Sequence, residues 1–364
     1  PAARPGPVLM AALGRTERIV LAVVALLTVL AGLARYTGWP SGLAFVLATL
    51  ALAGLAHVVG LATEQVGERF GPAVTGVLQS TLGNLPELFI VLFALAAGEL
   101  VVARASILGS LFANGLLVLG LTIVAGARAA PEGVMRFRTR LPQDTATLLL
   151  LTIAIIVLLG LSNQVGDRAS RHEVTISAIG AVVLLAVYGI WLFDYLRSDE
   201  PVEEAHREPV RSALPFKIAI IVLGVSGVAA ALVSDWFVAA LDPAVEALGI
   251  SKAFTGLVIV AIAGNAVENV VGVTLAAKGQ ADLAVSVVKN SVAQIAAFLF
   301  PALVLCSLAF ETRLTFVIGP VFIGALVVTA LSMWQITGDG EAIVFEGAAL
   351  VGMYVVLATL MWFE

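Results

Sequence analysis

Charged residues are scarce in this sequence. Lys, Arg, Asp and Glu make up 12% of the 364 residues, which is about half the share found in an average soluble domain and excludes an ordinary soluble fold. Histidine occurs three times and cysteine once. The lone cysteine, Cys306, excludes an intramolecular disulfide and a cysteine-based metal site, and its apolar neighbours predict a buried thiol.

Hydrophobic residues are abundant instead. They form 60% of the chain, and a mean hydropathy of +1.05 is typical of a protein that crosses the bilayer many times. The period-two alternation of an outer-membrane barrel is missing. We therefore expect an all-α polytopic membrane protein with about eleven transmembrane helices, at residues 18–36, 42–66, 71–98, 100–127, 140–162, 172–197, 214–240, 251–279, 280–310, 315–338 and 341–363.

The two halves of the chain repeat each other. A shift of 181 positions superposes five pairs without a gap, namely Gly83 on Gly264, Asn84 on Asn265, Glu87 on Glu268, Gly98 on Gly279 and Ser110 on Ser291. We predict a tail and one extra helix at 1–40, a first five-helix repeat at 41–197, an acidic cytoplasmic linker at 198–213 and a second repeat at 214–364. An odd number of spans per repeat inverts one copy relative to the other, which is a feature of secondary transporters.

Basic residues of the short loops predict the orientation. They are about twice as frequent on the side of the N-terminus, which is then cytoplasmic, and an odd number of helices places the C-terminus outside. Short loops without appended domains favour a prokaryotic plasma membrane. The expected partners are the lipid bilayer and transported cations, with no nucleic acid, and homo-oligomers are left open.

Two carboxylates lie within the apolar segments, in the motifs Gly83-Asn84-Leu85-Pro86-Glu87 and Gly264-Asn265-Ala266-Val267-Glu268. A charge at the bilayer centre costs several kcal/mol and persists only beside a partner, a proton or water. Neither motif contains a basic residue, so the expected partner is a bound cation or a proton. Pro86 lacks an N–H and is predicted to kink its helix, which leaves the carbonyl of Leu82 as an oxygen ligand of the kind Ca²⁺ prefers.

The helix after each motif has a polar face. Ser106, Ser110 and Asn114 recur at four-residue spacing, and Ser286, Asn290 and Gln294 do the same, with Ser291 beside them. A serine in a transmembrane helix commonly joins helices by hydrogen bonding. The matched pair of Ser110 and Ser291 leaves both interpretations open, helix packing and cation binding.

These motifs resemble the calcium/cation antiporter superfamily, and within it the Ca²⁺/H⁺ exchangers. The segment 75–126, with ASILGSLFANGLLVLG, is similar to the family's first signature repeat, and 254–310, with GNAVEN and SVAQIAAFLFPALVL, is similar to the second. The resemblance implies that Glu87 and Glu268 bind Ca²⁺ and protons in turn and that no cofactor is needed. It places five further residues near them: Asn84, Asn265, Ser110, Ser291 and Gln294.

The sequence departs from the family at three places. Leu85-Pro86 replaces the usual Ala-Thr, Asn269 replaces the histidine that commonly follows the second Glu, and Lys289 stands where the family has a small residue. One interpretation of Lys289 is an ammonium that pairs with Glu87 or Glu268 in the unloaded state; the other is a snorkelling or neighbour-paired lysine.

Two other ionisable residues are candidate modulators. His57 lies within the second predicted span, either on a proton path or as a hydrogen-bonded core histidine. Glu64 precedes the first motif, as part of an Ala-Thr-Glu pattern that also resembles the family, and either attracts cations or ends a helix at the interface.

The function expected from these residues is secondary antiport of Ca²⁺ against H⁺ by alternating access. Within the same class, a Na⁺(K⁺)/H⁺ or Na⁺/Ca²⁺ exchanger is the alternative, because of Lys289 and Asn269. A cation channel belongs to a different class and fits the inverted repeats less well. An enzyme is not expected, since no H-E-x-x-H motif is present.

Overall fold

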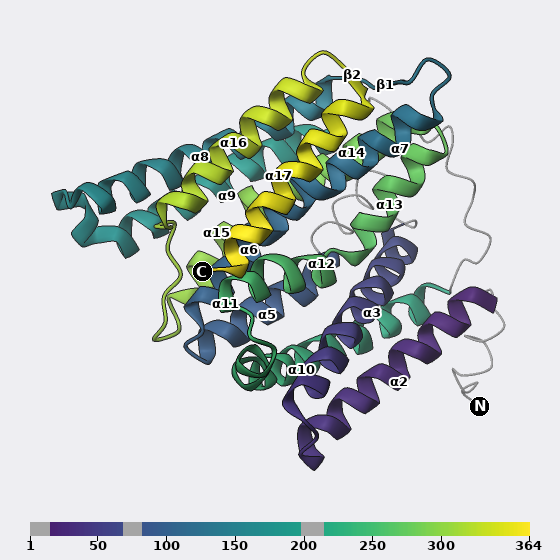
Figure 1. The fold of residues 1–364 in the computed structure, drawn as a ribbon, viewed down its shortest axis with the longest axis vertical. Coiled ribbons are helices and arrows are strands. Elements are labelled where there is room, and N and C mark those ends of the chain that lie inside the picture. Colours follow the sequence, from purple (N-terminus) through teal and green to yellow (C-terminus); the bar gives the residue numbers. More distant parts are fainter. Residues whose placement is uncertain (1–14, 68–81, 198–214) are drawn as a thin grey trace. The chain divides into compact units, whose positions relative to one another are not determined.

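The computed structural model describes residues 15–67, 82–197 and 215–364, and this part of the chain is almost entirely helical (Figure 1). The elements follow one another as α2 (Arg15–Thr37), α3 (Ser41–Gly67), α5 (Leu85–Ala96), α6 (Leu100–Phe112), η1 (Ala113–Val118), α7 (Leu119–Ala129), β1 (Val134–Arg136), α8 (Arg140–Val165), η2 (Arg168–His172), α9 (Glu173–Arg197), α10 (Phe216–Leu248), α11 (Lys252–Phe254), η4 (Thr255–Val260), α12 (Ala261–Gly264), α13 (Ala266–Ala277), α14 (Ala281–Gln294), η5 (Ile295–Leu299), α15 (Phe300–Ser307), α16 (Pro320–Thr337), β2 (Glu341–Ile343) and α17 (Val344–Trp362).

Within the described residues, nine helices are long and apolar enough to cross a membrane, and a tenth span is added if the bent pair Lys252–Gly264 and Asn269–Ala277 counts as one. The protein is therefore a polytopic all-α membrane protein, as the hydropathy predicts. Most predicted spans agree with the observed helices within a few residues. The main difference is α10, which continues through Pro243 to Leu248 instead of ending near residue 240. The third predicted span lies partly outside the described residues, as does the acidic linker, so the count of eleven stays a prediction.

The chain divides into two compact units, and each is described separately. The first comprises Pro1–Ile90 and Phe193–Gly249 and contains α2, α3 and α10, where α3 packs on both of the others. Phe45 and Phe237 join α3 to α10 with their ring centroids 4.9 Å apart. Gly54 lets α3 approach α2, because a Cβ there would lie 3.3 Å from Val24 Cγ1 and closer still to its other methyl group.

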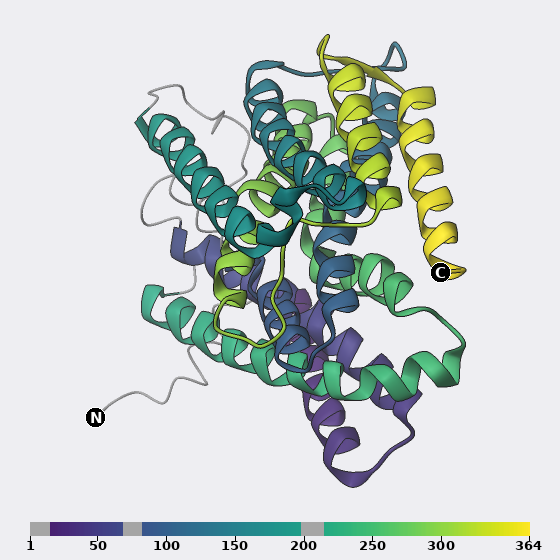
Figure 2. The ribbon, with the colours of Figure 1, turned by 90° about the vertical axis from the view of Figure 1, so that its left-hand side faces the viewer.

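The second unit comprises Val91–Leu192 and Ile250–Glu364. Its centre is formed by two long interrupted helices, α6–η1–α7 and α14–η5–α15. In the 18-residue apolar stretch of these helices, 83% and 72% of the residues are buried, whereas the share is 44% or less in each of the other seven candidate spans of the described residues. Helix α17 packs on α7, and α16 packs on α8. Figure 2 shows the same ribbon turned by 90°, with α16 and α17 side by side and running in opposite directions, and the C-terminus at the end of α17. The residues that carry the candidate site are thus enclosed by apolar helices.

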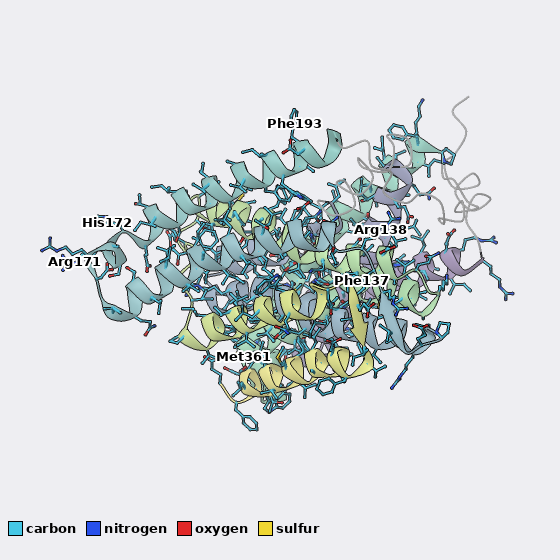
Figure 3. All side chains as sticks on the ribbon, turned by 90° about the horizontal axis from the view of Figure 1, so that it is seen from above. Phe137, Arg138, Arg171, His172, Phe193 and Met361 are labelled. Carbon is cyan, nitrogen blue, oxygen red and sulfur yellow. The ribbon has the colours of Figure 1, made fainter. Side chains whose placement is uncertain are left out.

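Polar groups mark the two ends of the second unit. Strands β1 and β2 pair antiparallel with Val134 opposite Ile343, and Arg136 bridges Glu132 and Glu341 at 2.7 and 3.0 Å. The hydrogen bonds to Glu341 and Glu132 raise the pKa of Arg136 above its ordinary value. Figure 3 labels Phe137 and Arg138 near this sheet, with Arg171 and His172 at the opposite tip of the unit, in the turn between α8 and α9. The 26 residues of α8 span about 39 Å between them.

The sequence repeat reappears in the backbone. Helix α5 covers Leu85–Ala96 and α13 covers Ala266–Ala277, so both ends differ by 181 positions. Gly98 and Gly279 follow with φ values of +84° and +77°, and each reverses the chain before the next long helix. Glycine is needed here because this left-handed region is strained for other residues. The π-helical turns η1 and η5 occupy matching places in the next helices.

One expectation about the fold is wrong. Cys306 is exposed on α15 and not a buried thiol. Its apolar neighbours in sequence do not reveal which face of the helix it occupies, because the face depends on how α15 packs.

Candidate functional site

Each Gly-Asn-x-x-Glu motif interrupts its helix at the asparagine. Asn84 is a turn residue directly before α5, and Asn265 lies between α12 and α13 with φ −102° and ψ 23°. The axis bends by 57° at the second break. The residues before Leu82 lie outside the described part of the chain, so the kink at Pro86 stays a prediction. A proline is not required for such a break, since the second motif breaks at the same register with Val267 at the corresponding place. Pro86 instead occupies the first turn of α5, where a missing N–H is tolerated.

The side chain of Asn265 connects the second break to α6. Its Nδ2 donates to Ser110 Oγ at 2.8 Å and to the carbonyl of Ala261 at 2.9 Å. Its Oδ1 accepts a hydrogen bond from Asn114 Nδ2 at 3.0 Å. Asn265, Ser110 and Asn114 are all fully buried, and we call these three residues the amide cluster. Buried polar groups joined in this way fix one another's orientation, which prepares the site before a ligand arrives.

Asn114 occupies the π-helical turn η1, a deformation that is frequent at functional sites. Its Nδ2 also donates to the carbonyl of Ser110 at 3.1 Å, so both amide hydrogens are used within the described residues. The Oδ1 atom is buried and has no hydrogen-bond partner in this part of the chain. An oriented carbonyl oxygen of this kind is a suitable ligand for a hard cation.

Helix α14 provides more oxygen atoms. Ser291 and Gln294 are buried, and Asn290 is partly buried. The Oγ of Ser291 and the Oδ1 of Asn290 are shielded from solvent and form no hydrogen bond in the described part of the chain. Ser291 is the repeat counterpart of Ser110, which accepts from Asn265. The structure therefore gives Ser110 a partner in the amide cluster, whereas the oxygen of Ser291 stays available to a ligand.

Asn269 stabilises the break between α12 and α13. Its Nδ2 donates to the carbonyl of Ile262 at 3.3 Å, across seven positions. The last carbonyls of a helix lack partners within the helix, so this bond satisfies one of them. Asn269 thus has a backbone role, and an amide cannot relay a proton as an imidazole does.

The first motif lies in the other unit. Glu87 is 1% exposed in the first turn of α5, Asn84 is 5% exposed, and Leu82 lies in the helical turn just before them. The backbone of Glu268 occupies the corresponding turn of α13, while its side chain lies outside what the structure describes. A glutamate near a helix N-terminus is stabilised in its charged form by the helix dipole, which suits a carboxylate that receives a cation.

His57 and Glu64 lie on α3. His57 is exposed, so the interpretation as a buried core histidine is wrong. Glu64 is partly buried in the last turn of α3, and both interpretations of it stay predictions. Both stay candidate modulators only.

Lys289 on α14 lines a small cavity together with side chains of α8 and α16. It is 2% exposed, and its Nζ donates to Thr337 Oγ1 at 2.6 Å. In the described part of the chain Lys289 forms no ion pair, and its hydrogen-bond partner is Thr337. Sequence reasoning missed Thr337, which lies 48 positions away. No local signal marks it, because α16 also contains Thr329, Ser332 and Gln335.

The donor set suits a transported cation better than a resident metal. No group of three or more His, Cys, Asp or Glu side chains converges in the described ranges. The ligands that the second unit offers in the described residues are buried amide and hydroxyl oxygens. Oxygen ligands favour hard cations such as Ca²⁺, and few fixed charges allow the ion to leave again.

Comparison with known proteins identifies one family. The profile described as sodium/calcium exchanger protein matches residues 40–194 and 218–363. The Ca²⁺/H⁺ antiporter ChaA of Bacillus subtilis strain 168 is 33% identical over 327 residues, which cover 88% of this chain and 92% of that protein. The Ca²⁺/H⁺ antiporter of Aphanothece halophytica is 30% identical over 354 residues, covering 91% and 93%. The structure of native YfkE aligns with a TM-score of 0.79 at 30% identity, over 95% of this chain and 100% of that chain.

Proposed function

This chain belongs to the sodium/calcium exchanger family, and we propose that it is a secondary antiporter that exchanges Ca²⁺ for H⁺ across the membrane. The observation that carries the proposal is the pair of helix breaks at Asn84 and Asn265, each followed within one turn by a glutamate. Relatives at 30% identity or more, over about nine tenths of the chain, have this activity in their names. Na⁺- or K⁺-coupled exchange is therefore not favoured.

Glu87 and Glu268 are the proposed exchange acids. In the deprotonated form they bind Ca²⁺, and protonation of the carboxylates releases it, so the ion and the protons occupy the site in turn. The same two groups cannot hold both at once, and this exclusion couples the two fluxes. The dipoles of α5 and α13 support the charged form of each acid when the site is open.

Amide, hydroxyl and backbone oxygens complete the proposed coordination. Asn84, Asn265, Ser291 and Gln294 supply side chains, with Ser110 holding Asn265 in place, and the carbonyl of Leu82 supplies a backbone ligand. Asn114 joins this set, because its Oδ1 is buried and oriented by two hydrogen bonds through Nδ2. Broken helices whose ends provide carbonyls are the usual cation sites of transporters with repeats.

The two five-helix repeats, at 41–197 and 214–364, are proposed to be inverted and to supply alternating access. Matching helix ends and matching glycine turns at an offset of 181 residues support the repeat itself. We place the N-terminus in the cytoplasm and the C-terminus outside, in a prokaryotic plasma membrane, on the distribution of basic residues in short loops.

Transport in everted vesicles tests this function. Vesicles that contain the protein should lose an imposed pH gradient when Ca²⁺ is added, and Glu87→Gln should abolish the response. Glu311→Gln, an exposed loop carboxylate, is the matched control and should behave as wild type. A gradient that collapses with Na⁺ or K⁺ but not with Ca²⁺ contradicts the proposal. Cation flux without proton movement indicates a channel.

A further inference from the structure

Lys289 and Thr337 form a buried polar pair between α14 and α16. The Nζ of Lys289 lies 2.6 Å from Thr337 Oγ1. The hydroxyl of Thr337 donates to the carbonyl of Met333, also at 2.6 Å, so its oxygen is left to accept from the ammonium. The threonine is 1% exposed and the lysine 2%. One charged group is therefore held in a fixed place inside the apolar unit.

The first repeat has no such pair. At the offset of 181 residues, Lys289 corresponds to Leu108 and Thr337 to Ile156. Both of these counterparts are hydrophobic and 0% exposed. The lysine and its acceptor therefore stand together in one repeat where the other repeat has an apolar pair, and this points to a role in the difference between the two halves. If these two positions only filled space in the core, leucine and isoleucine would pack there equally well, as they do in the first repeat.

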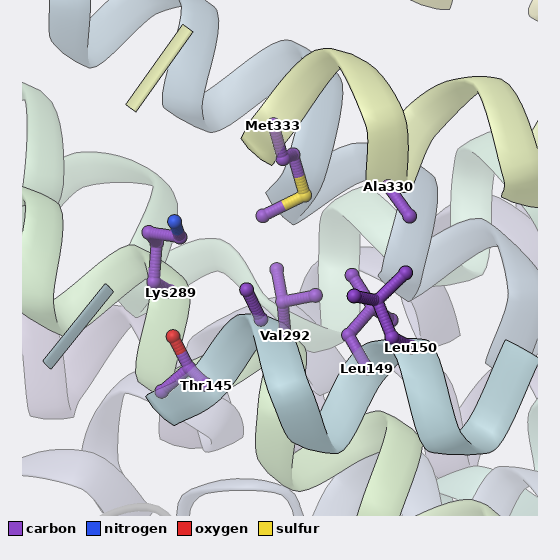
Figure 4. Close-up of a pocket in the computed structure, with 8 residues that line it drawn as sticks. Thr145, Leu149, Leu150, Lys289, Val292, Ala330 and Met333 are labelled. Atoms are coloured by element: carbon purple, nitrogen blue, oxygen red, sulfur yellow. The ribbon is translucent and has the colours of Figure 1, made fainter. Parts of the chain in front are cut away.

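Little around the ammonium neutralises its charge. The small cavity that it lines is bounded by Leu149, Val292, Ala330 and Met333, with Thr145 as the other polar side chain (Figure 4). Lys289 forms no ion pair within the described ranges. Thr337 is the last residue of α16, so the partial negative charge of the helix C-terminus compensates part of the positive charge. The remaining field acts over a longer distance than that of a surface charge, because salt screens a buried charge only weakly.

We infer that Lys289 is an internal positive charge that weakens cation binding at the exchange site and does so more strongly for divalent than for monovalent ions. This inference rests on the proposed function. The lysine shares α14 with Ser291 and lies two residues before it, so the ammonium is within roughly 12 Å of that hydroxyl although it occupies a different face. It acts on the ion through space and touches no ligand.

Coulomb's law gives the size and sign of the effect. At roughly 12 Å and an effective dielectric constant of about 20, a unit charge weakens binding of a monovalent cation by about tenfold and of a divalent cation by about a hundredfold. Compensation by the end of α16 reduces both factors. Removing the charge should therefore lower the KM for Ca²⁺ by at least about threefold. The factor by which Na⁺ binding tightens should be about the square root of the factor for Ca²⁺, because Na⁺ carries half the charge.

The test compares variants that remove or keep the charge. Lys289→Met keeps the length of the side chain, Lys289→Arg keeps the charge, and Lys289→Leu combined with Thr337→Ile rebuilds the apolar pair of the first repeat. The KM and maximal rate for Ca²⁺ are measured in vesicles, together with the Na⁺ concentration that halves Ca²⁺ uptake. We expect a lower KM in the methionine and double variants and a KM near wild type in the arginine variant.

Leu108→Met is the matched control, because it alters the counterpart position without changing charge, and its KM should not move. The inference is overturned if the KM for Ca²⁺ stays within about twofold of wild type in both uncharged variants, or if the arginine variant shifts equally. The proposed function itself is overturned if vesicles with the wild-type protein show no proton movement when Ca²⁺ is added. The two proposals therefore fail separately.

Discussion

Asn114 donates a hydrogen bond from its side-chain amide to Asn265 Oδ1 at 3.0 Å, across 151 positions of the chain. The bond joins a π-helical turn in the first repeat to the helix break in the second. Ser110 strengthens the connection by accepting from Asn265 Nδ2 at 2.8 Å. The two repeats thus share one polar centre, which orients the oxygens that we propose as cation ligands.

The amide cluster predicts a large effect of Asn265→Ala. The substitution removes three side-chain hydrogen bonds and leaves Ser110 and Asn114 with buried groups that lack their partner. Each such group costs about 1–3 kcal/mol, so stability should fall by at least about 2 kcal/mol and exchange by at least about tenfold. Thermal denaturation in detergent and vesicle transport measure the two effects. Asn163→Ala, which removes one hydrogen bond to Glu173 near the α8–α9 turn, is the control. Equal effects of both variants would contradict the account.

A second prediction concerns the crossing of α6 with the helix that contains η4. A Cβ on Gly109 would overlap the Cα and the carbonyl of Leu257, and a Cβ on Gly256 would lie 2.7 Å from the Cβ of Ala105. Backbone atoms cannot move aside as a flexible side chain can. Gly109→Ala should therefore lower the melting temperature and the exchange rate together. Gly189→Ala on α9 meets no atom within 4 Å and should change neither. A Gly109→Ala protein of unchanged stability would show that the helices do not cross as closely as described.

The repeated glycine turns predict equal costs in the two halves. Gly98 and Gly279 have φ values of +84° and +77°, and an added Cβ has space at both positions. Only the backbone strain remains, which costs about 1 kcal/mol for alanine. Gly98→Ala and Gly279→Ala should therefore lower the melting temperature by similar amounts. A loss at one position alone would contradict the structural equivalence of the turns.

The ion pair of Lys252 and Glu99 predicts a small and salt-sensitive effect. Its atoms are 2.8 Å apart, but the side chains are 36% and 19% exposed. A pair with this access to solvent contributes less than about 1 kcal/mol. Lys252→Met should therefore lower the melting temperature only slightly in dilute buffer, and the difference should vanish at about 1 M salt, where the Debye length is about 3 Å. A large loss that persists in high salt would show that the pair acts as a buried contact.

Much of the architecture could be predicted from the sequence because the bilayer imposes it. Helix lengths follow from membrane thickness, and the repeat follows from glycine, asparagine and glutamate at one offset. The sequence predicted a kink only at Pro86, and the break at Asn265 was not predicted. Pro86 is present in one break only, and the bend of the other is maintained by hydrogen bonds of Asn265 and Asn269.

Other features depend on contacts between distant segments and could not be predicted. The direction of Lys289 is decided by Thr337, and no local pattern connects positions 48 residues apart. The role of Asn114 depends on the π-helical turn, whose extra residue changes which face its side chain occupies. His57 is exposed because of how α3 packs, although the residues around it in sequence are apolar.

Proton release on Ca²⁺ binding tests the central claim most directly, since that claim is that the ion and the protons compete for the same two carboxylates. Purified protein in a weakly buffered detergent solution near neutral pH receives Ca²⁺ while the pH is recorded. The account predicts acidification in wild type and in Glu311→Gln, and its loss in Glu87→Gln and in Glu268→Gln. Ca²⁺ binding without proton release, or release that persists in both Glu87→Gln and Glu268→Gln, would contradict it.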